Sequence, residues 1–220
     1  MVDSVFAAIL VKSLSGSKSR LSKVLSPSER MRLTVAMLRD VLQAVRDSET
    51  VSETIIVSPE SDVLKLADGL GVRGVLQTEQ GLNGAVDQTT RWCLRNQGVS
   101  VLILPVDIPL ISFEDVNNIA GLASTSRAVV ISPSLDGGTN AMLQRPPGVI
   151  PPCYGPDSFR KHLSSALSRR VKVGVYRSSR VSLDIDSPED LRAFMEAPSR
   201  TFTYKLLSGL DLTTIQQKLL

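Results

Sequence analysis

Short apolar segments alternate with longer amphipathic segments along most of this chain, and this order restricts the possible folds. The apolar segments expected to form strands are Phe6–Val11, Thr54–Val57, Val72–Leu76, Val101–Leu104, Ala128–Ile131, Ala141–Leu143 and Val171–Tyr176. The segments expected to form helices are 27–45, Pro59–Asp68, Leu82–Asn96, Phe113–Ala123, Ser158–Ser168 and Pro188–Glu196. Strands and helices in this order form parallel sheets through right-handed crossovers. The sequence therefore predicts an α/β fold with a mostly parallel central sheet and helices on both faces.

The first expected helix has strong local signals at its start. Ser26 is a good N-cap, Pro27 suits the first helical position, and Glu29 completes a capping box. Apolar residues then follow at helical spacing and predict the buried face. They are Met31, Val35, Leu38, Val41, Leu42 and Val45. Further along, Gly98 is expected to stop the third helix.

The most apolar strand is followed by a single carboxylate. Val101–Leu104 contains no alternating polar residue, so it is expected to be buried on both faces. Pro105 ends the strand, and Asp107 lies between Pro105 and Pro109 at the edge where α/β sheets bind ligands. The alternative is that Asp107 caps the next helix, but the Ser112–Asp115 segment already supplies a capping box. We interpret Asp107 as a metal ligand.

A second group of acids occurs in Ser182-Leu-Asp-Ile-Asp-Ser-Pro-Glu-Asp-Leu191. Helix capping by Ser187 and the favourable position of acids in a first helical turn explain the last two acids. Asp184 and Asp186 remain, and in an extended segment they point to the same side. Together with Asp107 they would supply the oxygen ligands that Mg²⁺ prefers.

The loop after the first strand is rich in basic residues. Lys12, Lys18, Arg20 and Lys23 lie between a strand and a helix, where α/β folds bind phosphate groups. The spacing is neither that of a Walker A loop nor, with Gly16 alone, that of a dinucleotide fingerprint. The four cations suit a triphosphate, and the alternative is a solvated surface loop.

Two glycine-containing stretches complete the candidate site. In Asp136–Ala141 the adjacent glycines suggest an anion nest with Thr139 and Asn140 as donors, a plain turn being the alternative. In Tyr154–Phe159, Gly155 permits close approach to the start of a helix near Ser158. His162, next to Lys161, is expected at the surface, and Cys93 is expected to pack inside a helix interface. No Ser/His/Asp triad can be assembled.

Composition and charge restrict the class of protein. The 220 residues predict one domain over 1–198 and a tail over 199–220, whose leucines predict packing on the domain or a homodimer contact. No apolar run is long enough to span a bilayer, and the two cysteines, in no metal or redox spacing, favour a reducing cytoplasmic location. The net charge is +3 and aromatic residues are 4%, with none among the basic residues of the first loop. A compact phosphate ligand is therefore expected, with no nucleic acid or membrane partner.

Several motifs together resemble the 2-phospho-L-lactate guanylyltransferase family of coenzyme F-420 biosynthesis, within the Rossmann-like nucleotidyltransferases. The resemblance covers roughly residues 5–197. It is carried by Val11-Lys12, Lys18–Leu21, Leu25–Pro27, Asp40–Leu42, Gly81–Asn83, Leu104–Leu110, Asp136–Ala141, Gly155–Phe159 and Asp184–Leu191. The Asp-x-Pro-Leu and Asp-Ser-Pro-Glu-Asp-Leu pieces are shared by many nucleotidyltransferases. The Asp-Gly-Gly-Thr-Asn and Gly-Pro-Asp-Ser-Phe pair narrows the resemblance to this family.

The resemblance implies a three-layer Rossmann-like fold and transfer of GMP from GTP to a phosphorylated three-carbon acid, with release of pyrophosphate and with Mg²⁺ as cofactor. It implies that Asp107, Asp184 and Asp186 bind the metal, and that Lys12, Lys18, Arg20 and Lys23 hold the triphosphate and serve catalysis with Asp107. It further implies that Gly81, Leu82 and Asn83 contact the guanosine. Thr139, Asn140, Gly155 and Ser158 would bind the acceptor.

Other functions remain open from the sequence alone. One alternative is a nucleotidyltransferase for a sugar phosphate or molybdopterin, and another is a nucleotide-binding module without turnover. The residues do not distinguish 2-phospho-L-lactate, phosphoenolpyruvate and 3-phospho-D-glycerate as acceptors. In the reaction that the resemblance implies, a phosphate oxygen of the acceptor is the attacking group, so positioning and charge stabilisation are required rather than a protein nucleophile.

Overall fold

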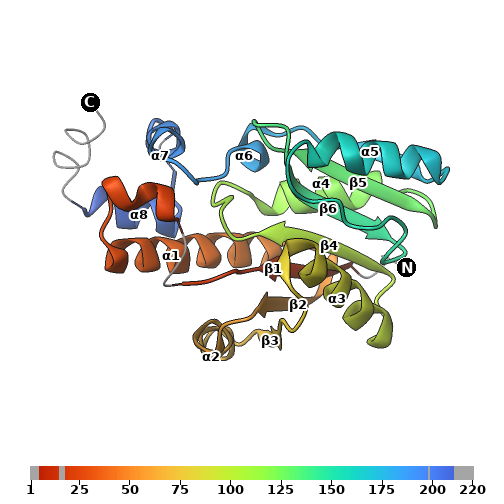
Figure 1. Cartoon of the computed structure of the whole chain (residues 1–220), viewed down its shortest axis with the longest axis horizontal. Helices are drawn as coiled ribbons and strands as arrows, with labels where there is room; N and C mark the ends of the chain where they lie inside the picture. Colours follow the sequence, from red (N-terminus) through yellow and green to blue (C-terminus); the bar gives the residue numbers. More distant parts are fainter. Residues whose placement is uncertain (1–4, 15–17, 198, 211–220) are drawn as a thin grey trace.

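A central sheet organises the part of the chain that the structure describes. The structure is a computed structural model, and it describes residues 5–14, 18–197 and 199–210. These residues form a seven-stranded sheet in the order β3-β2-β1-β4-β6-β5-β7 (Figure 1). The strands are β1 Val5–Leu10, β2 Val51–Ser58, β3 Arg73–Leu76, β4 Ser100–Pro105, β5 Ala128–Pro133, β6 Thr139–Arg145 and β7 Lys172–Val175.

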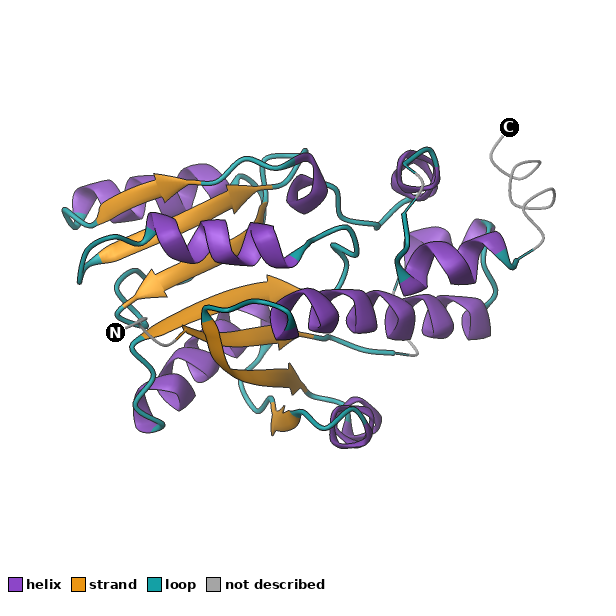
Figure 2. Ribbon diagram, turned by 180° about the vertical axis from the view of Figure 1, so that it is seen from behind, coloured by secondary structure: helices purple, strands orange, loops and turns teal. Residues whose placement is uncertain are grey.

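Helices cover both faces of this sheet and form three layers with it (Figure 2). They are η1 Ser19–Lys23, α1 Pro27–Arg46, α2 Ser61–Gly69, α3 Gly81–Arg95, α4 Phe113–Leu122, α5 Ser158–Ser168, α6 Ser179–Ser182, α7 Pro188–Met195 and α8 Phe202–Ser208. One apolar core joins the sheet to α1, α2, α4 and α6, and a second core joins its other face to α3 and α5. The predicted α/β layers are confirmed.

The sheet is mostly parallel, as predicted, with one antiparallel strand. β6 pairs antiparallel with both β4 and β5, whereas β1, β2, β3 and β4 run parallel. Only five residues, 134–138, separate β5 from β6. Because a parallel crossover requires about a dozen residues or more, this connection can only be a hairpin. The strand predicted over Ala141–Leu143 extends over all of Thr139–Arg145.

The helix α1 begins as predicted but buries a wider face than its apolar stripe indicated. Ser26 and Glu29 form a capping box in which each side chain bonds the backbone of the other. Met31, predicted to be buried, is 42% exposed, whereas Leu33 and Met37 are fully buried. They face a third apolar core formed with η1, α7 and α8. The helix is therefore covered on two sides.

The end of α3 differs from the prediction that Gly98 stops it. The helix ends at Arg95, and Gln97, with φ 63°, takes the left-handed conformation expected of a C-terminal glycine. A Cβ on Gly98 would lie 3.1 Å from both the Cys93 carbonyl oxygen and the Phe6 ring. Gly98 is thus favoured by close packing rather than by its backbone angle. Cys93 is buried in this interface, as predicted.

The described part of the predicted tail folds back on the domain. The short helix α8, which the sequence analysis did not anticipate, packs on α1 and buries Leu207. Leu212, Ile215, Leu219 and Leu220 lie outside the described residues, so the homodimer contact stays a prediction. No helix in the described ranges has the length and apolarity that crossing a membrane requires.

Asp40 of α1 fixes the start of α8. Its carboxylate accepts from the backbone N–H of Phe202 at 2.6 Å and of Thr203 at 2.9 Å. Burial raises the pKa of Asp40, which these hydrogen bonds partly offset. We expect Asp40→Ala to lower the free energy of unfolding by about 1–2 kcal/mol, the typical loss for a helix cap. Urea titration measures this, and an unchanged midpoint would show that α8 docks without the carboxylate.

Candidate active site

The site begins where the order of strands reverses. β1 lies between β2 and β4, and Leu10 is paired with Pro105 at the carboxyl ends of β1 and β4. Lys12 and Asp107 follow two residues after this pair, so both lie at the switch point where open α/β sheets bind ligands. Ser112 caps α4 through its own capping box, which leaves Asp107 free of that role, as predicted.

The second acidic segment crosses the end of β4. The backbone N–H of Ile185 donates to the Asp107 carbonyl oxygen at 2.9 Å, which places Asp184 and Asp186 on either side of this contact. Asp190 holds the far end because its carboxylate accepts from the backbone N–H groups of Asp186 and Ser187. The Ser187 cap of α7 is confirmed. Local helix capping thus also fixes the position of Asp186.

Lys18 joins the two acidic positions. Its Nζ donates to Asp107 Oδ2 at 2.7 Å and to Asp186 Oδ1 at 2.5 Å, and its side chain is only 5% exposed. Burial alone would lower the pKa of Lys18, but the two carboxylates raise it above its ordinary value. The ammonium therefore stays charged and binds both acids at once.

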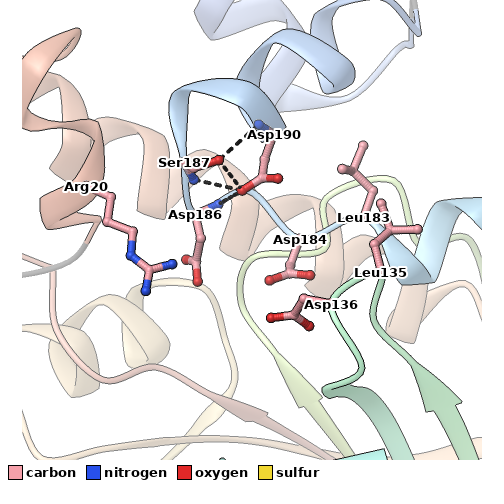
Figure 3. Close-up of a pocket in the computed structure, with 8 residues that line it drawn as sticks. All are labelled: Arg20, Leu135, Asp136, Leu183, Asp184, Asp186, Ser187 and Asp190. Atoms are coloured by element: carbon pink, nitrogen blue, oxygen red, sulfur yellow. Dashed lines mark hydrogen bonds between the residues drawn. The ribbon is translucent and has the colours of Figure 1, made fainter. Parts of the chain in front are cut away.

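A pocket of about 220 Å³ opens beside this ion pair (Figure 3). Arg20 enters it from one side with its guanidinium directed towards Asp186, and the carboxylates of Asp136 and Asp184 face each other on the other side. Leu135, Leu183, Ser187 and Asp190 complete the lining. Four carboxylates and a single cation give this pocket an excess of negative charge, which favours a bound cation.

Asp184 is the most perturbed of these acids. Burial, reinforced by the negative charges of Asp107, Asp186 and Asp136, raises the pKa of Asp184 to about 6. The amide nitrogen of Asn140 donates to Asp184 at 3.0 Å and to the Val181 carbonyl oxygen at 2.9 Å. Asn140 therefore lies in β6 with its side chain committed to holding Asp184.

Thr139, Ser158 and His162 form a buried group on the neighbouring side of β6. Ser158 Oγ and Thr139 Oγ1 are 3.1 Å apart, and His162 Nδ1 lies 3.1 Å from the same threonine oxygen. The prediction of a surface His162 is wrong, because its side chain is fully buried. Ser158, His162 and Ala166 recur at a spacing of four residues, which was a usable signal for a buried helix face.

The predicted anion nest at Gly137 and Gly138 is not formed. The Gly137 N–H donates to the Ser134 carbonyl oxygen and the Gly138 N–H to the Asp136 carboxylate at 3.1 Å. Both donors are used within the hairpin, so the plain turn is the correct alternative. The turn instead supports α5, because the Phe159 N–H donates to the Gly137 carbonyl oxygen at 3.2 Å.

The predicted guanosine edge forms the start of α3. Gly81 has φ 71°, Leu82 is 49% exposed, and Asn83 faces the loop before α5. Asn83 Oδ1 accepts from the Tyr154 N–H at 2.7 Å and its Nδ2 donates to the Tyr154 carbonyl oxygen at 3.2 Å. Asn83 thus connects α3 to the loop that carries Gly155, a link the sequence analysis missed.

The remaining predicted cations lie further out. Lys12 and Lys23 are exposed, and Lys23 belongs to η1, whose Leu21 packs into the same core as Ile185. Within the described ranges, no three acidic, histidine or cysteine side chains are close enough together to hold a metal ion. A carboxylate pair that already shares one cation, with Asp184 beside it, nevertheless has the chemistry of a site for a hard divalent cation.

Comparisons with known proteins identify the family to which this chain is similar. Residues 5–218 match the family described as "Guanylyl transferase CofC like". The phosphoenolpyruvate guanylyltransferase of Rubrobacter xylanophilus is 44% identical over 86% of this chain and 92% of its own length. The 2-phospho-L-lactate guanylyltransferase of Methanothermobacter thermautotrophicus is 40% identical over 84% of this chain and 81% of its own length.

A solved structure supports the fold. A putative nucleotide-diphospho-sugar transferase from Desulfovibrio desulfuricans G20 superposes with a TM-score of 0.82 over 99% of both chains. At 20% sequence identity this similarity concerns the architecture alone. The predicted Rossmann-like α/β fold is therefore confirmed.

Proposed function

The chain belongs to the CofC-like guanylyl transferase family, and from this premise we propose that it transfers GMP from GTP to a phosphorylated three-carbon acid in coenzyme F-420 biosynthesis. The observation that carries the proposal is the Lys18–Asp107–Asp186 cluster at the switch point of the sheet. Paired carboxylates at this edge suit a metal-assisted nucleotidyl transfer better than a sugar-binding or purely nucleotide-binding site. The enzyme is a nucleotidyltransferase.

The proposed acceptor is 2-phospho-L-lactate or phosphoenolpyruvate. Both are small acids that carry a phosphate on a three-carbon skeleton, and the two relatives described above are named for them. In the reaction a phosphate oxygen of the acceptor forms a bond to the α-phosphorus of GTP. The bond from that phosphorus to the bridging β-oxygen breaks, and pyrophosphate leaves with the electron pair.

The chain's own residues position two anions and stabilise charge in this reaction. Lys18 and Arg20 lie beside the acidic cluster, where their cations would neutralise the triphosphate and the departing pyrophosphate. Lys12, two residues after β1, and Lys23, in η1, would extend this positive surface. The attacking oxygen is already ionised, so the mechanism requires no protein base.

Asp107 and Asp186, with Asp184 beside them, are the residues that would hold Mg²⁺. A bound Mg²⁺ would supply Lewis-acid charge to the phosphates. Asp107 follows a strand whose residues 100–104 are buried, and Asp186 is fixed by the cap of α7, so both carboxylates are preorganised. Asn140 performs the same task for Asp184.

Thr139, Gly155 and Ser158 are the proposed pocket for the acceptor. Gly155 has φ 119°, and its carbonyl oxygen accepts from the Ser158 N–H at 3.1 Å, which closes the turn towards Thr139. The Ser158 hydroxyl donates to Thr139 Oγ1 at 3.1 Å. The Thr139 proton is then directed away from Ser158, where an acceptor phosphate would receive it.

This arrangement predicts unequal effects of two substitutions. Thr139→Val removes the hydroxyl that faces the acceptor, so the KM for phosphoenolpyruvate should rise about ten- to a hundredfold, as for a lost bond to a charged group. Ser158→Ala removes only the hydrogen bond that the Ser158 hydroxyl donates to Thr139, so it should raise the KM for phosphoenolpyruvate less. Steady-state kinetics with each substrate varied tests the order. If both variants instead raise the KM for GTP, the two pockets are reversed.

The proposed function is tested by an acceptor screen with Mg²⁺ and pyrophosphate release as the readout. We expect turnover with GTP and either 2-phospho-L-lactate or phosphoenolpyruvate, and a lower rate with ATP. Discrimination against adenine should amount to about 1–3 kcal/mol for each buried polar group that the wrong base leaves unpaired. 3-Phospho-D-glycerate and a sugar 1-phosphate serve as comparison acceptors. Turnover with the sugar phosphate alone would contradict the proposal.

A further inference from the structure

His162 contacts two of the segments that form the proposed acceptor pocket, the start of β6 and the loop before α5. It lies on α5, and its side chain is fully buried. Nδ1 lies 3.1 Å from Thr139 Oγ1 on β6, and Nε2 accepts from the Cys153 backbone N–H at 2.8 Å. His162 does not contact the acceptor itself, but Thr139 is one of the residues proposed to bind it, and Cys153 lies two residues before Gly155.

The hydrogen bonds determine the tautomer of this ring. Because Nε2 accepts from an amide N–H, it carries no proton, so the proton of the neutral ring is on Nδ1. Burial supports the neutral form, since it lowers the pKa of His162 to about 4. Nδ1–H therefore donates to Thr139 Oγ1.

This donation fixes the direction of the Thr139 hydroxyl proton. Thr139 Oγ1 accepts from His162 Nδ1 and from Ser158 Oγ, which uses both of its lone pairs. Its own proton must then point to a third partner, and the described residues supply no acceptor for it. A hydroxyl held in this way is a preoriented donor for an anion in the pocket.

The second bond of His162 fixes the loop in front of Gly155. The Cys153 N–H is held by the imidazole, and the Tyr154 backbone is held on its other side by both polar atoms of Asn83. The Tyr154 ring also packs edge-on against His162, with ring centroids 4.8 Å apart. The loop is thus clamped between α5 and α3.

From these contacts we infer that His162 is a positioning residue for the acceptor: it orients the Thr139 hydroxyl and holds the Cys153–Tyr154 backbone in place. The inference rests on the proposed function of the Thr139, Gly155 and Ser158 pocket. It assigns His162 an effect on acceptor binding and none on the triphosphate side, where Lys18 and Arg20 act.

Three substitutions separate the two bonds. His162→Phe fills the space without either bond, His162→Asn retains a donor near Nδ1, and His162→Gln retains an acceptor near Nε2. We expect His162→Phe to raise the KM for phosphoenolpyruvate about tenfold while the KM for GTP stays within about twofold. The KM values of the two amide variants for phosphoenolpyruvate should lie between those of His162→Phe and the wild type.

A matched control distinguishes positioning from general loss of stability. Ala166 is fully buried one turn further along α5, and Ala166→Gly destabilises the helix without touching Thr139 or Cys153. It should lower the melting temperature and leave the KM for phosphoenolpyruvate unchanged. The inference would be overturned if the KM for phosphoenolpyruvate rose in proportion to the loss of melting temperature across all four variants. Equal rises in the KM values for phosphoenolpyruvate and GTP would overturn it too.

Nuclear magnetic resonance gives a readout without turnover. His162 is the single histidine of the chain, so the ¹⁵N signals of its ring need no assignment once any affinity tag is removed. We expect the Nδ1-protonated tautomer, and a larger shift with phosphoenolpyruvate than with GTP. The opposite tautomer would overturn the inference. A wild-type protein inert with every acceptor, but showing the expected tautomer, would instead contradict the proposed function.

Discussion

Asp107→Asn should reduce the rate of pyrophosphate release by about 100-fold or more, the scale of losing one preorganised charge-stabilising group. The carboxylate is one of two that share the Lys18 ammonium at the switch point of the sheet. Asparagine keeps the shape and also the main-chain carbonyl that accepts from Ile185, so the crossing segment should remain in place. The melting temperature should therefore change little. Nearly full activity, or an unfolded protein, would contradict the role given to Asp107.

A surface aspartate provides the control for Asp107. Asp62 forms an ion pair with Lys65 in which both side chains are more than three-quarters exposed, at 76% and 77%. Such pairs contribute about 0–1 kcal/mol, so Asp62→Asn should change neither the rate nor the melting temperature measurably. Comparison of Asp107→Asn with Asp62→Asn therefore separates the effect of removing any one negative charge from the effect of removing it at the site.

The second large effect is expected for Asp115→Ala, this time on stability. The Asp115 side chain is completely buried and accepts from Arg180 at 2.7 Å, from Tyr176 at 2.7 Å and from Ser178 at 2.9 Å. It also caps α4 through the Ser112 N–H at 2.9 Å. Loss of the cap and of these bonds should lower the free energy of unfolding by about 3 kcal/mol, measured by urea titration. Glu114→Ala, on the exposed neighbouring residue, should change it by less than about 0.5 kcal/mol.

The same carboxylate should make stability depend on pH. Burial raises the pKa of Asp115, but the bonds from Arg180, Tyr176, Ser112 and Ser178 outweigh it and lower the pKa below 3.8. A carboxylate whose pKa is lower in the folded state contributes its full stabilisation at pH values above its unfolded-state pKa. This stabilisation is lost as the pH falls through the folded-state pKa. The unfolding free energy of the wild type should thus fall more steeply below about pH 4 than that of Asp115→Asn. Parallel curves would contradict this.

Local signals predicted much of the fold because their causes are local. The caps at Ser26, Ser112 and Ser187 depend on residues three positions apart, and all three form as expected. The strand end at Asp107 was equally readable, because Pro105 and a run of buried residues define it. Features that depend on contacts between distant segments were harder. Met31, predicted to be buried, is exposed, and Leu33, outside the predicted stripe, is buried because α7 and α8 cover a second side of α1.

The site shows the same division. The sequence supplied Asp107, Asp184 and Asp186 as candidate ligands, and the structure brings Asp107 and Asp186 to a common partner. That partner, Lys18, was expected to bind phosphate, and nothing in its spacing indicates a contact with residues 89 and 168 positions away. His162 was misplaced because its neighbour Lys161 is polar, whereas burial is decided by the partners Thr139 and Cys153 on other elements.

The position of Lys18 has a consequence for the order in which a metal ion and a nucleotide can bind. A divalent cation that enters between Asp107 and Asp186 competes with an ammonium already tethered there, so it should bind weakly to the free protein. A bound triphosphate would offer Lys18 another anion and would release the two carboxylates. By thermodynamic linkage, each of the two ligands would then raise the affinity for the other by the same factor. We therefore propose that Lys18 couples the binding of metal and nucleotide.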